Sequence, residues 1–311
     1  MSPSTSPSVT VRVPAKVNVQ LAVGGRRADG FHGLASVFLA VGLYDQLTVT
    51  PSSEGLTVTV EGTDAEHVPA DRSNLAARAA ELLAARHGID PSVRLHIAKD
   101  IPVAGGMAGG SADAAAALVA CDALWGTGSS PAELARLAAE LGSDVPFALL
   151  GGVALGEGRG ELLTPVPVGG DFHWVFAVAD GGLSTPAVYG ECDRLRALGG
   201  GADEADVPAP TADPALLAAL AAGDAAALGA TLRNDLQSAA LSLRPSLAAT
   251  LRAGGEAGAI GSLVSGSGPT CAFLAKDAES AGTVAQALAA SGTCRDVRVT
   301  RGPVDGARVV R

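Results

Sequence analysis

One stretch, Ile101-Pro-Val-Ala-Gly-Gly-Met-Ala-Gly-Gly-Ser-Ala-Asp-Ala-Ala-Ala-Ala117, places four glycines between a strand-like run and an alanine-rich helical run. Glycines let backbone N–H groups turn toward a ligand, and the start of a helix offers unpaired N–H groups and the positive end of its dipole. The stretch contains neither Gly-Lys-Ser/Thr nor Gly-x-Gly-x-x-Gly, so it is not one of the common nucleotide loops. It predicts a phosphate-binding loop. A flexible strand-to-helix turn without a ligand is the alternative.

The first half of the chain predicts an early sheet followed by helices. Apolar runs with β-branched residues mark strands at Val9–Val13, Gln46–Thr50, Leu56–Val60 and Val93–Ile97. Helices are expected from Ser73-Asn74 to Gly88, from Ser111 to Leu124 and from Ser130 to Gly142. The third helix starts with a capping serine, a proline at the first helical position and a glutamate three residues after the cap.

The second half predicts a further α+β domain. Strands are expected at 153–155 and 174–179, helices near 214–228 and 235–251, and a β-α-β unit over 262–300. Residues 199–213 are rich in Gly, Ala, Asp and Pro without periodicity and predict a mobile surface loop. We therefore place one domain at residues 1–166 and a second at 167–311.

Composition excludes several classes of protein. With 311 residues, of which 48% are hydrophobic, the chain can fill two cores, and its net charge of −10 disfavours nucleic-acid binding. No apolar run approaches the roughly 20 residues that cross a bilayer. Residues 1–8 lack the basic start and apolar block of a secretion signal and predict a short disordered tail. We expect a cytoplasmic protein without membrane or nucleic-acid partners.

The sequence shows no metal-binding spacing. The four cysteines have no Cys-x-x-Cys pair and are expected to be small core residues, and the five histidines have no His-Glu-x-x-His pattern. The cysteines are Cys121, Cys192, Cys271 and Cys294. Any metal is expected to arrive with a phosphate substrate.

Two further motifs accompany the glycine loop, Pro14-Ala-Lys-Val-Asn18 and Ser265-Gly-Ser-Gly-Pro-Thr270. In this order, the three motifs resemble the signature of the galactokinase, homoserine kinase, mevalonate kinase and phosphomevalonate kinase (GHMP) superfamily. The resemblance implies an α+β fold of two domains. The N-terminal domain would bind ATP and contain a left-handed β-α-β crossover, the C-terminal domain would be ferredoxin-like, and the active site would lie in the cleft between them.

Within the superfamily, the chain is most similar to the branch that phosphorylates the 2-hydroxyl of cytidine-diphosphate-linked methylerythritol in isoprenoid precursor synthesis. The matching segments are Gly24-Gly-Arg-Arg-Ala-Asp-Gly-Phe-His32, Leu141-Gly-Ser-Asp-Val-Pro-Phe147, Gly156-Glu-Gly-Arg-Gly-Glu161 and Arg233-Asn-Asp-Leu236, and the similarity spans roughly residues 9–275. One departure is Phe31, where the branch usually has tyrosine. Stacking on cytosine needs only the ring faces, so Phe31 is expected to serve.

The resemblance assigns catalysis to Lys16 and Asp144. Asp144 would accept the proton of the attacking hydroxyl, and Lys16 would keep that carboxylate ionised and offset charge on the transferring phosphoryl group. Without the resemblance, Asp144 is better interpreted as the cap of the next short helix and Lys16 as a solvated strand-edge residue. Only three of the 22 basic residues are lysines, which weakens the second alternative.

ATP and Mg²⁺ are the implied cofactors, with Mg²⁺ bridging the phosphates and no protein ligand assigned to it. The residues expected to contact the nucleotide are Pro102, Ala104, Gly105, Gly106, Met107, Ala108, Gly109, Gly110, Ser111 and, in the adenine pocket, Asn74. Ser111 is also expected to be the N-cap of its helix.

The implied partner is a small molecule, the cytidine-diphosphate-linked methylerythritol. Phe31 and Tyr189 would stack on its cytosine, His32 would hydrogen-bond the edge of that base, and Asn18 would lie near the methylerythritol hydroxyls. Thr185, in the Thr-Pro that precedes Tyr189, is also expected at this site. A lone histidine is otherwise more often a surface or core residue.

Two other functions remain open at this point. One is a superfamily kinase acting on mevalonate, homoserine or a sugar, which the segment Gly30-Phe31-His32 and Tyr189 disfavour because they suit a pyrimidine. The other is a catalytically inactive nucleotide-binding protein on the same fold, which the intact Lys16 and Asp144 disfavour.

Overall fold

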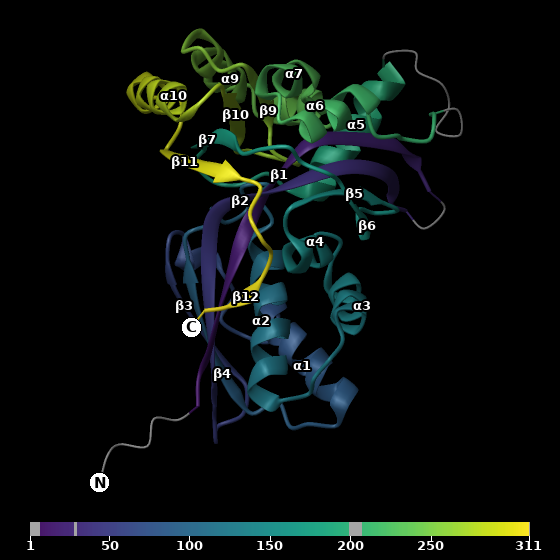
Figure 1. The fold of residues 1–311 in the computed structure, drawn as a ribbon, viewed down its shortest axis with the longest axis vertical. Coiled ribbons are helices and arrows are strands. Elements are labelled where there is room, and N and C mark those ends of the chain that lie inside the picture. Colours follow the sequence, from purple (N-terminus) through teal and green to yellow (C-terminus); the bar gives the residue numbers. More distant parts are fainter. Residues whose placement is uncertain (1–6, 28–29, 199–206, 311) are drawn as a thin grey trace.

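The computed structural model describes residues 7–27, 30–198 and 207–310 (Figure 1). Residues 1–6 of the predicted tail and 199–206 of the predicted loop lie outside them. The described chain forms two sheets, a large one in the lower half of Figure 1 and a small one in the upper half, each with helices packed against it. The predicted α+β fold is confirmed.

The large sheet has the strand order β12-β1-β2-β4-β3, with β5 also pairing with β2, β6 with β5, and β8 with β1. Its strands are β1 Val9–Arg26, β2 His32–Pro51, β3 Thr57–Gly62, β4 Val93–Lys99, β5 Val153–Glu157, β6 Leu162–Pro165, β8 Arg233–Asn234 and β12 Arg308–Val309. β3 and β4 run parallel and are joined through a helix, as the expected β-α-β crossover requires. All four strands predicted in the first half are present.

β1 and β2 are far longer than predicted, at 18 and 20 residues. They pair as an antiparallel ribbon whose register shifts between Pro14 and Ala15 and again between Asn18 and Gln20. The first shift leaves two extra residues on β2, Gly42 and Leu43, and the second leaves one on β1, Val19. The prediction covered only one end of each strand, although the apolar–polar alternation of β1 continues in the sequence to Val23. The missed middle of β1 carries Lys16 and Asn18, both buried.

The large sheet is covered by α1 Leu75–His87, α2 Gly109–Trp125, α3 Pro131–Leu141 and α4 Val145–Leu150 (Figure 1). The predicted starts of α1 and α3 are confirmed. Asn74 accepts a hydrogen bond from the backbone N–H of Ala76 at the start of α1, which ends at Gly88 in a left-handed conformation. Ser130 caps α3 by accepting from the backbone N–H of Glu133.

The predicted N-cap of α2 is wrong. The helix begins at Gly109, which makes Ser111 its third residue, and the capping position is held by Ala108 with φ 63° and no side-chain cap. The left-handed turn at Ala108 starts the helix two residues earlier than the serine suggested. The first-turn N–H groups of α2 therefore have no side-chain acceptor at the capping position.

The small sheet has the antiparallel order β11-β7-β10-β9. Its strands are β7 Phe172–Val178, β9 Gly261–Val264, β10 Cys271–Ala275 and β11 Asp296–Gly302. In the part of the chain that the structure describes, five helices, beginning with α5 Thr185–Leu198, and the short strand β8 of the large sheet lie between β7 and β9, and α10 Ala278–Ser291 lies between β10 and β11. Within the small sheet the chain therefore follows β-α-β-β-α-β, with several helices in the first connection. This is the ferredoxin-like arrangement that was expected. The unit over 262–300 is accordingly a hairpin, a helix and a strand.

Two of the predicted helices are each interrupted. The prediction at 214–228 corresponds to α6 Pro214–Ala222 and α7 Ala225–Thr231, because α6 ends at Gly223 in a left-handed conformation. The prediction at 235–251 corresponds to α8 Gln237–Leu243 and α9 Leu247–Glu256, separated at Pro245, which cannot continue a helix. A 3₁₀ turn, η1 Ala65–His67, follows β3.

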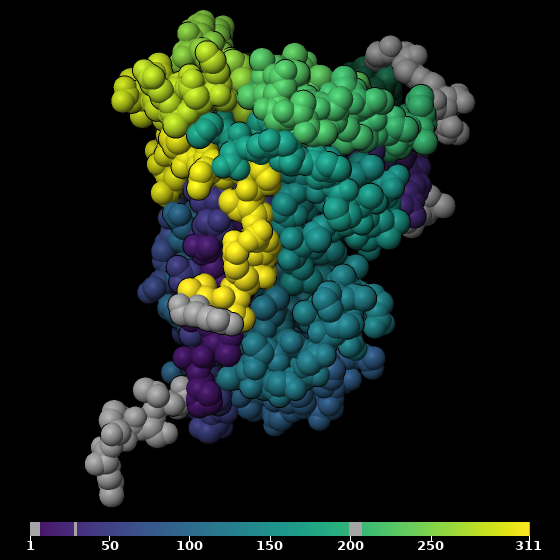
Figure 2. Space-filling view, in the orientation of Figure 1, coloured from purple at the N-terminus to yellow at the C-terminus, as the bar shows by residue number. Residues whose placement is uncertain are grey.

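The chain returns to the large sheet after the small one. β12 pairs with β1, and in Figure 2 the yellow C-terminal segment runs down the surface from the small-sheet half over the large-sheet half. β6 ends at Pro165 and β7 begins at Phe172, so the boundary predicted after residue 166 falls between the two sheets along the chain. That boundary remains a prediction.

The cysteines are reduced, and three of the four are buried, as expected of small core residues. No helix among the described residues has both the length and the apolar character needed to cross a membrane.

A buried charge cluster joins three elements of the large-sheet half. Lys99, at the end of β4, hydrogen-bonds Asp45 of β2 and, at 2.8 Å, Asp113 of α2. The second oxygen of Asp45 accepts the backbone N–H groups of Asp100 and Ile101. The cluster therefore fixes the strand end that leads into the glycine loop and the helix that follows it.

We predict that Lys99→Met destabilises the protein by about 3–5 kcal/mol, because two buried carboxylates lose their only cationic partner among the described residues. Lys276→Met is the matched control, since Lys276 is exposed and its loss should change stability by less than about 0.5 kcal/mol. Urea denaturation at neutral pH measures both variants. Equal stabilities would show that the cluster contributes nothing to the fold.

Candidate active site

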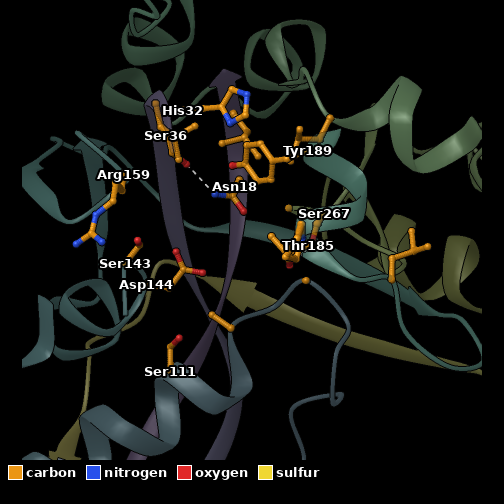
Figure 3. A pocket seen from close by; sticks show the side chains of 18 of the residues that line it. Asn18, His32, Ser36, Ser111, Ser143, Asp144, Arg159, Thr185, Tyr189 and Ser267 are labelled. Carbon is orange, nitrogen blue, oxygen red and sulfur yellow. Dashed lines mark hydrogen bonds between the residues drawn. The ribbon is translucent and has the colours of Figure 1, made fainter. Parts of the chain in front are cut away.

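A cavity of about 730 Å³ is lined by residues from both halves of the molecule. The large-sheet half contributes β1, β2, the glycine loop, the start of α2 and the turn before α4, and the other half contributes α5 and the β9–β10 turn. Figure 3 shows Ser111 toward one end, Asp144 between, and His32 with Tyr189 toward the other end. The predicted cleft is thus lined by most of the predicted site residues.

Lys16 is the buried cation of this cavity. Its Nζ donates hydrogen bonds to Asn18 Oδ1 at 2.6 Å and to the Gly106 carbonyl at 2.9 Å, and lies 3.7 Å from Asp144 Oδ2. Burial lowers the pKa of Lys16, while the charge of Asp144 acts in the opposite direction. The side chain is far from the solvated strand-edge position considered as its alternative.

Asp144 occupies the capping position of α4, but its side chain makes no capping hydrogen bond. The carboxylate is about one third exposed and lines the cavity beside Ser143 (Figure 3). A carboxylate held near a lysine and open to the cavity can accept a proton from a bound hydroxyl. The capping interpretation fails here because the side chain bonds none of the helix N–H groups.

Asn18 links Lys16 to β2. Its Oδ1 accepts from Lys16, and its Nδ2 donates to Ser36 Oγ at 2.7 Å (Figure 3). Ser36 Oγ in turn donates to the Gln20 carbonyl. Asn18 therefore orients the lysine. Its expected contact with the methylerythritol hydroxyls stays a prediction.

The three sequence motifs meet at the carbonyl of Gly106. This oxygen accepts from Lys16 Nζ and, at 3.1 Å, from Ser265 Oγ. Gly106 has φ 76°, and a Cβ there would collide with the Ser265 carbonyl, so only glycine permits this approach of the loop to the β9–β10 turn. The loop, the lysine strand and the turn are in direct contact.

The start of α2 suits a phosphate. Gly109, Gly110 and Ser111 line the cavity, and their N–H groups lie in the first turn, where no intrahelical acceptor exists. The glycines differ in role. A Cβ on Gly109 would lie 3.2 Å from Lys99 Nζ, whereas one on Gly110 would meet only Leu75 at 3.7 Å. Gly109 allows the helix to pack on the buried cluster, and Gly110 faces open space.

Only some of the other residues predicted to contact the nucleotide line the cavity. Ala104, Gly105, Gly106 and Ala108 line the cavity. Pro102, Met107 and Asn74 are not among its lining residues. Met107 is buried and accepts the backbone N–H of Lys16 through its carbonyl, and the Asn74 amide caps α1 and donates to Pro69 O.

The far end of the cavity is built on α5. Thr185, Tyr189 and Asp193 are spaced at i, i+4 and i+8 and line the cavity from one face of this helix. Tyr189 stacks on His32 with ring centroids 5.0 Å apart, and Asp193 Oδ1 lies 2.9 Å from His32 Nε2. Thr185 Oγ1 bonds Ser267 Oγ of the β9–β10 turn at 2.9 Å. His32 is thus held in place, not free on a surface.

Phe31 lies at the rim of the cavity and is half exposed. The guanidinium carbon of Arg159 lies 5.2 Å from the centroid of its ring. Phe31 and Tyr189 both line the cavity, as a clamp on a base would require, and no direct contact between them is needed for that role.

Sequence reasoning gave no role to Arg159, Asp193 or Ser36. Asp193 could have been found from the helical spacing with Tyr189, and Arg159 from its place between two glycines in a segment already matched. Ser36 has no such signal, because its position opposite Leu21 depends on the shifted register of β1 and β2.

Comparison with known proteins identifies the family of this chain. The GHMP kinases N terminal domain family matches residues 74–152, and the GHMP kinases C terminal family matches residues 216–294. Relatives from Streptomyces avermitilis and Thermobifida fusca, both named 4-diphosphocytidyl-2-C-methyl-D-erythritol kinase, are 68% and 61% identical. Each alignment covers 97% of this chain, and 100% and 98% of the relatives respectively.

Solved structures agree. A crystal structure of 4-(cytidine 5'-diphospho)-2C-methyl-D-erythritol kinase superimposes with a TM-score of 0.75 at 35% identity, covering 94% of this chain and 99% of the other. A homoserine kinase from Cytophaga hutchinsonii has a TM-score of 0.74 at 20% identity, covering 100% and 99%, and shares the fold. With near-complete coverage at up to 68% identity, the chain belongs to the 4-diphosphocytidyl-2-C-methyl-D-erythritol kinase family of the GHMP kinases.

Proposed function

We propose that this protein transfers the γ-phosphoryl group of ATP to the 2-hydroxyl of 4-diphosphocytidyl-2-C-methyl-D-erythritol. The observation that carries the proposal is the pair of Asp144 and Lys16, 3.7 Å apart in a cavity that joins a phosphate-type loop to an aromatic subsite. The names of the relatives support the choice of substrate. The reaction belongs to the non-mevalonate route to isoprenoid precursors.

The chemistry assigned to the protein is proton transfer and charge stabilisation. Asp144 takes the proton of the attacking hydroxyl, and general-base catalysis of this kind is worth about 10²–10⁴-fold. Lys16, oriented by Asn18, supplies positive charge to the transferring phosphoryl oxygens. Binding of the rest of the substrate at the α5 end aligns the hydroxyl with the γ-phosphorus of ATP. Because the phosphoryl group then passes directly to the hydroxyl, no covalent enzyme intermediate is needed.

The triphosphate is assigned to the glycine loop and the α2 N-terminus. The first-turn N–H groups and the helix dipole favour negative charge there. Mg²⁺, bound to the phosphates, would neutralise the charge that develops during transfer. Ser111, in the cavity wall at the α2 start, has a hydroxyl oxygen that would suit that ion (Figure 3).

The competing functions make different demands on the site. The acceptor of a mevalonate or homoserine kinase carries no nucleobase, so the activity of such an enzyme would not depend on stacking by Phe31 or Tyr189. An inactive nucleotide-binding protein would not depend on Asp144. A phosphoryl-transfer assay that compares the cytidyl substrate with mevalonate and homoserine separates these functions directly, and the cytidyl substrate is expected to react.

Asp144→Asn is expected to lower kcat by at least about a hundredfold because the amide cannot accept the proton. The melting temperature should hardly change, since the carboxylate does not cap α4. Asp224→Ala is the matched control, because Asp224 does cap its helix and its loss should cost about 0.5–2 kcal/mol with kcat intact. A loss of stability with normal turnover in Asp144→Asn would restore the capping interpretation.

Gly110→Val tests the nucleotide end. The added side chain projects from the α2 start at a position that is exposed to the cavity and free of close contacts, so it should raise KM for ATP without unfolding the helix. Steady-state kinetics with each substrate varied in turn measures the effect. If KM rises equally for ATP and for the cytidyl substrate, the loop does not hold the triphosphate selectively.

Phe31→Ala tests the aromatic subsite. Base–aromatic stacking is worth about 1–3 kcal/mol, so KM for the cytidyl substrate should rise roughly five- to over a hundredfold while KM for ATP barely moves. Phe31→Tyr keeps the ring face and should be tolerated. Tyr189→Ala should act in the same direction, although it also removes the ring that stacks on His32. A substrate subsite elsewhere would leave KM unchanged in Phe31→Ala.

A further inference from the structure

Arg159 is a cation of the cavity wall that the reaction chemistry above does not use. It lies in the tight β5–β6 turn between Gly158 and Gly160, both with positive φ. Its backbone N–H donates to Glu161 Oε2 at 2.6 Å, and its Nε lies 3.5 Å from Glu161 Oε1. The turn and the glutamate thus fix where the side chain starts.

The Arg159 guanidinium is held in position, but within the described part of the chain not all of its N–H groups are hydrogen-bonded. It lies over the Phe31 ring, and the side chain is about one third exposed. Its two terminal amino groups have no hydrogen-bond partner among the residues that the structure describes, so a planar fork of donors remains available. Such a fork matches phosphate oxygens and can bind them bidentately.

Arg159 lies between the two regions of the cavity that are assigned to the acceptor, one for its base and one for its reacting hydroxyl. In Figure 3, Arg159 is on the side of Ser143 and Asp144, at a level between Asp144 and His32. A cytidine-diphosphate-linked alcohol that places its base near Phe31 and its hydroxyl near Asp144 must place its diphosphate between them. Of the other cavity cations, Lys16 is already engaged by Asn18, Gly106 and Asp144, and Arg26 donates through Nε to the Gly30 carbonyl at 3.4 Å.

We infer that Arg159 binds the diphosphate of the nucleotide-linked acceptor and thereby selects acceptors that carry this group. Arg159 contacts Phe31, so base and diphosphate are recognised by touching residues. This inference rests on the proposed function. The phosphates of ATP have the same chemistry, and the experiment is designed to separate the two sources.

The test measures binding of cytidine and of cytidine diphosphate, with a non-hydrolysable ATP analogue saturating the nucleotide site. Wild-type protein should bind the diphosphate more tightly than the nucleoside. In Arg159→Gln the affinity for cytidine diphosphate should fall roughly tenfold or more, as expected for lost charge-assisted hydrogen bonds, while cytidine binding is little changed. Arg159→Lys should lie between, because it keeps the charge and loses the fork.

Arg301→Gln is the charge-matched control. Arg301 pairs with Asp171 in an exposed position and is not among the cavity residues, so its loss should leave both affinities unchanged. Equal weakening of cytidine and cytidine diphosphate in Arg159→Gln would overturn the inference, since Arg159 would then act only by supporting Phe31. A raised KM for ATP with unchanged diphosphate affinity would also overturn it, by assigning Arg159 to ATP. If wild type binds neither cytidine ligand, the proposed function itself fails.

Discussion

The position of the glycine loop depends on the ammonium group of Lys99, which lies between two carboxylates in the interior. Burial lowers the pKa of Lys99, but the charges of Asp113 and Asp45 outweigh this and raise it, so the cation is retained. Burial raises the pKa of Asp113 to about 7 in spite of the lysine. Two buried acids and one cation are costly to desolvate, and they are tolerated because they join β2, β4 and α2 where the loop begins and ends.

This cluster holds the glycine loop in shape. Asp45 also bonds the N–H groups of Asp100 and Ile101, and α2 packs on Lys99 through a glycine. The loop is therefore held by protein groups alone, and in the function proposed above its N–H donors would need little reorganisation. At the other side, the Gly106 carbonyl accepts hydrogen bonds from Lys16 and Ser265, so the glycine loop, β1 and the β9–β10 turn meet at one acceptor.

Local rules predicted much of this fold, and long-range register accounts for most of what they missed. Asn74, Ser130 and Gly88 carry short-range capping signals, and those helix ends were predicted correctly. The prediction of β1 ended at Val13, before Pro14, although its apolar–polar alternation continues to Val23, and Lys16 within the missed part was identified from its motif. Ser111 was misassigned as a cap because the left-handed turn at Ala108 has no residue signature. The helical spacing with Tyr189 could place Asp193 at the site, but its contact with His32 joins residues 161 apart and has no local signal.

The return of the chain to the first sheet has a mechanical consequence. β8 and β12 both pair with β1, yet the residues between them build most of the second sheet. The two halves therefore share hydrogen-bonded strands and are joined by more than one segment of the chain. If one half moves relative to the other and changes the width of the cavity, the β1–β2 ribbon has to bend. Such bending strains the hydrogen bonds between these two strands. Adjustment to a ligand is accordingly easier in side chains at the rim of the cavity, such as the half-exposed Phe31, than in the frame that carries them.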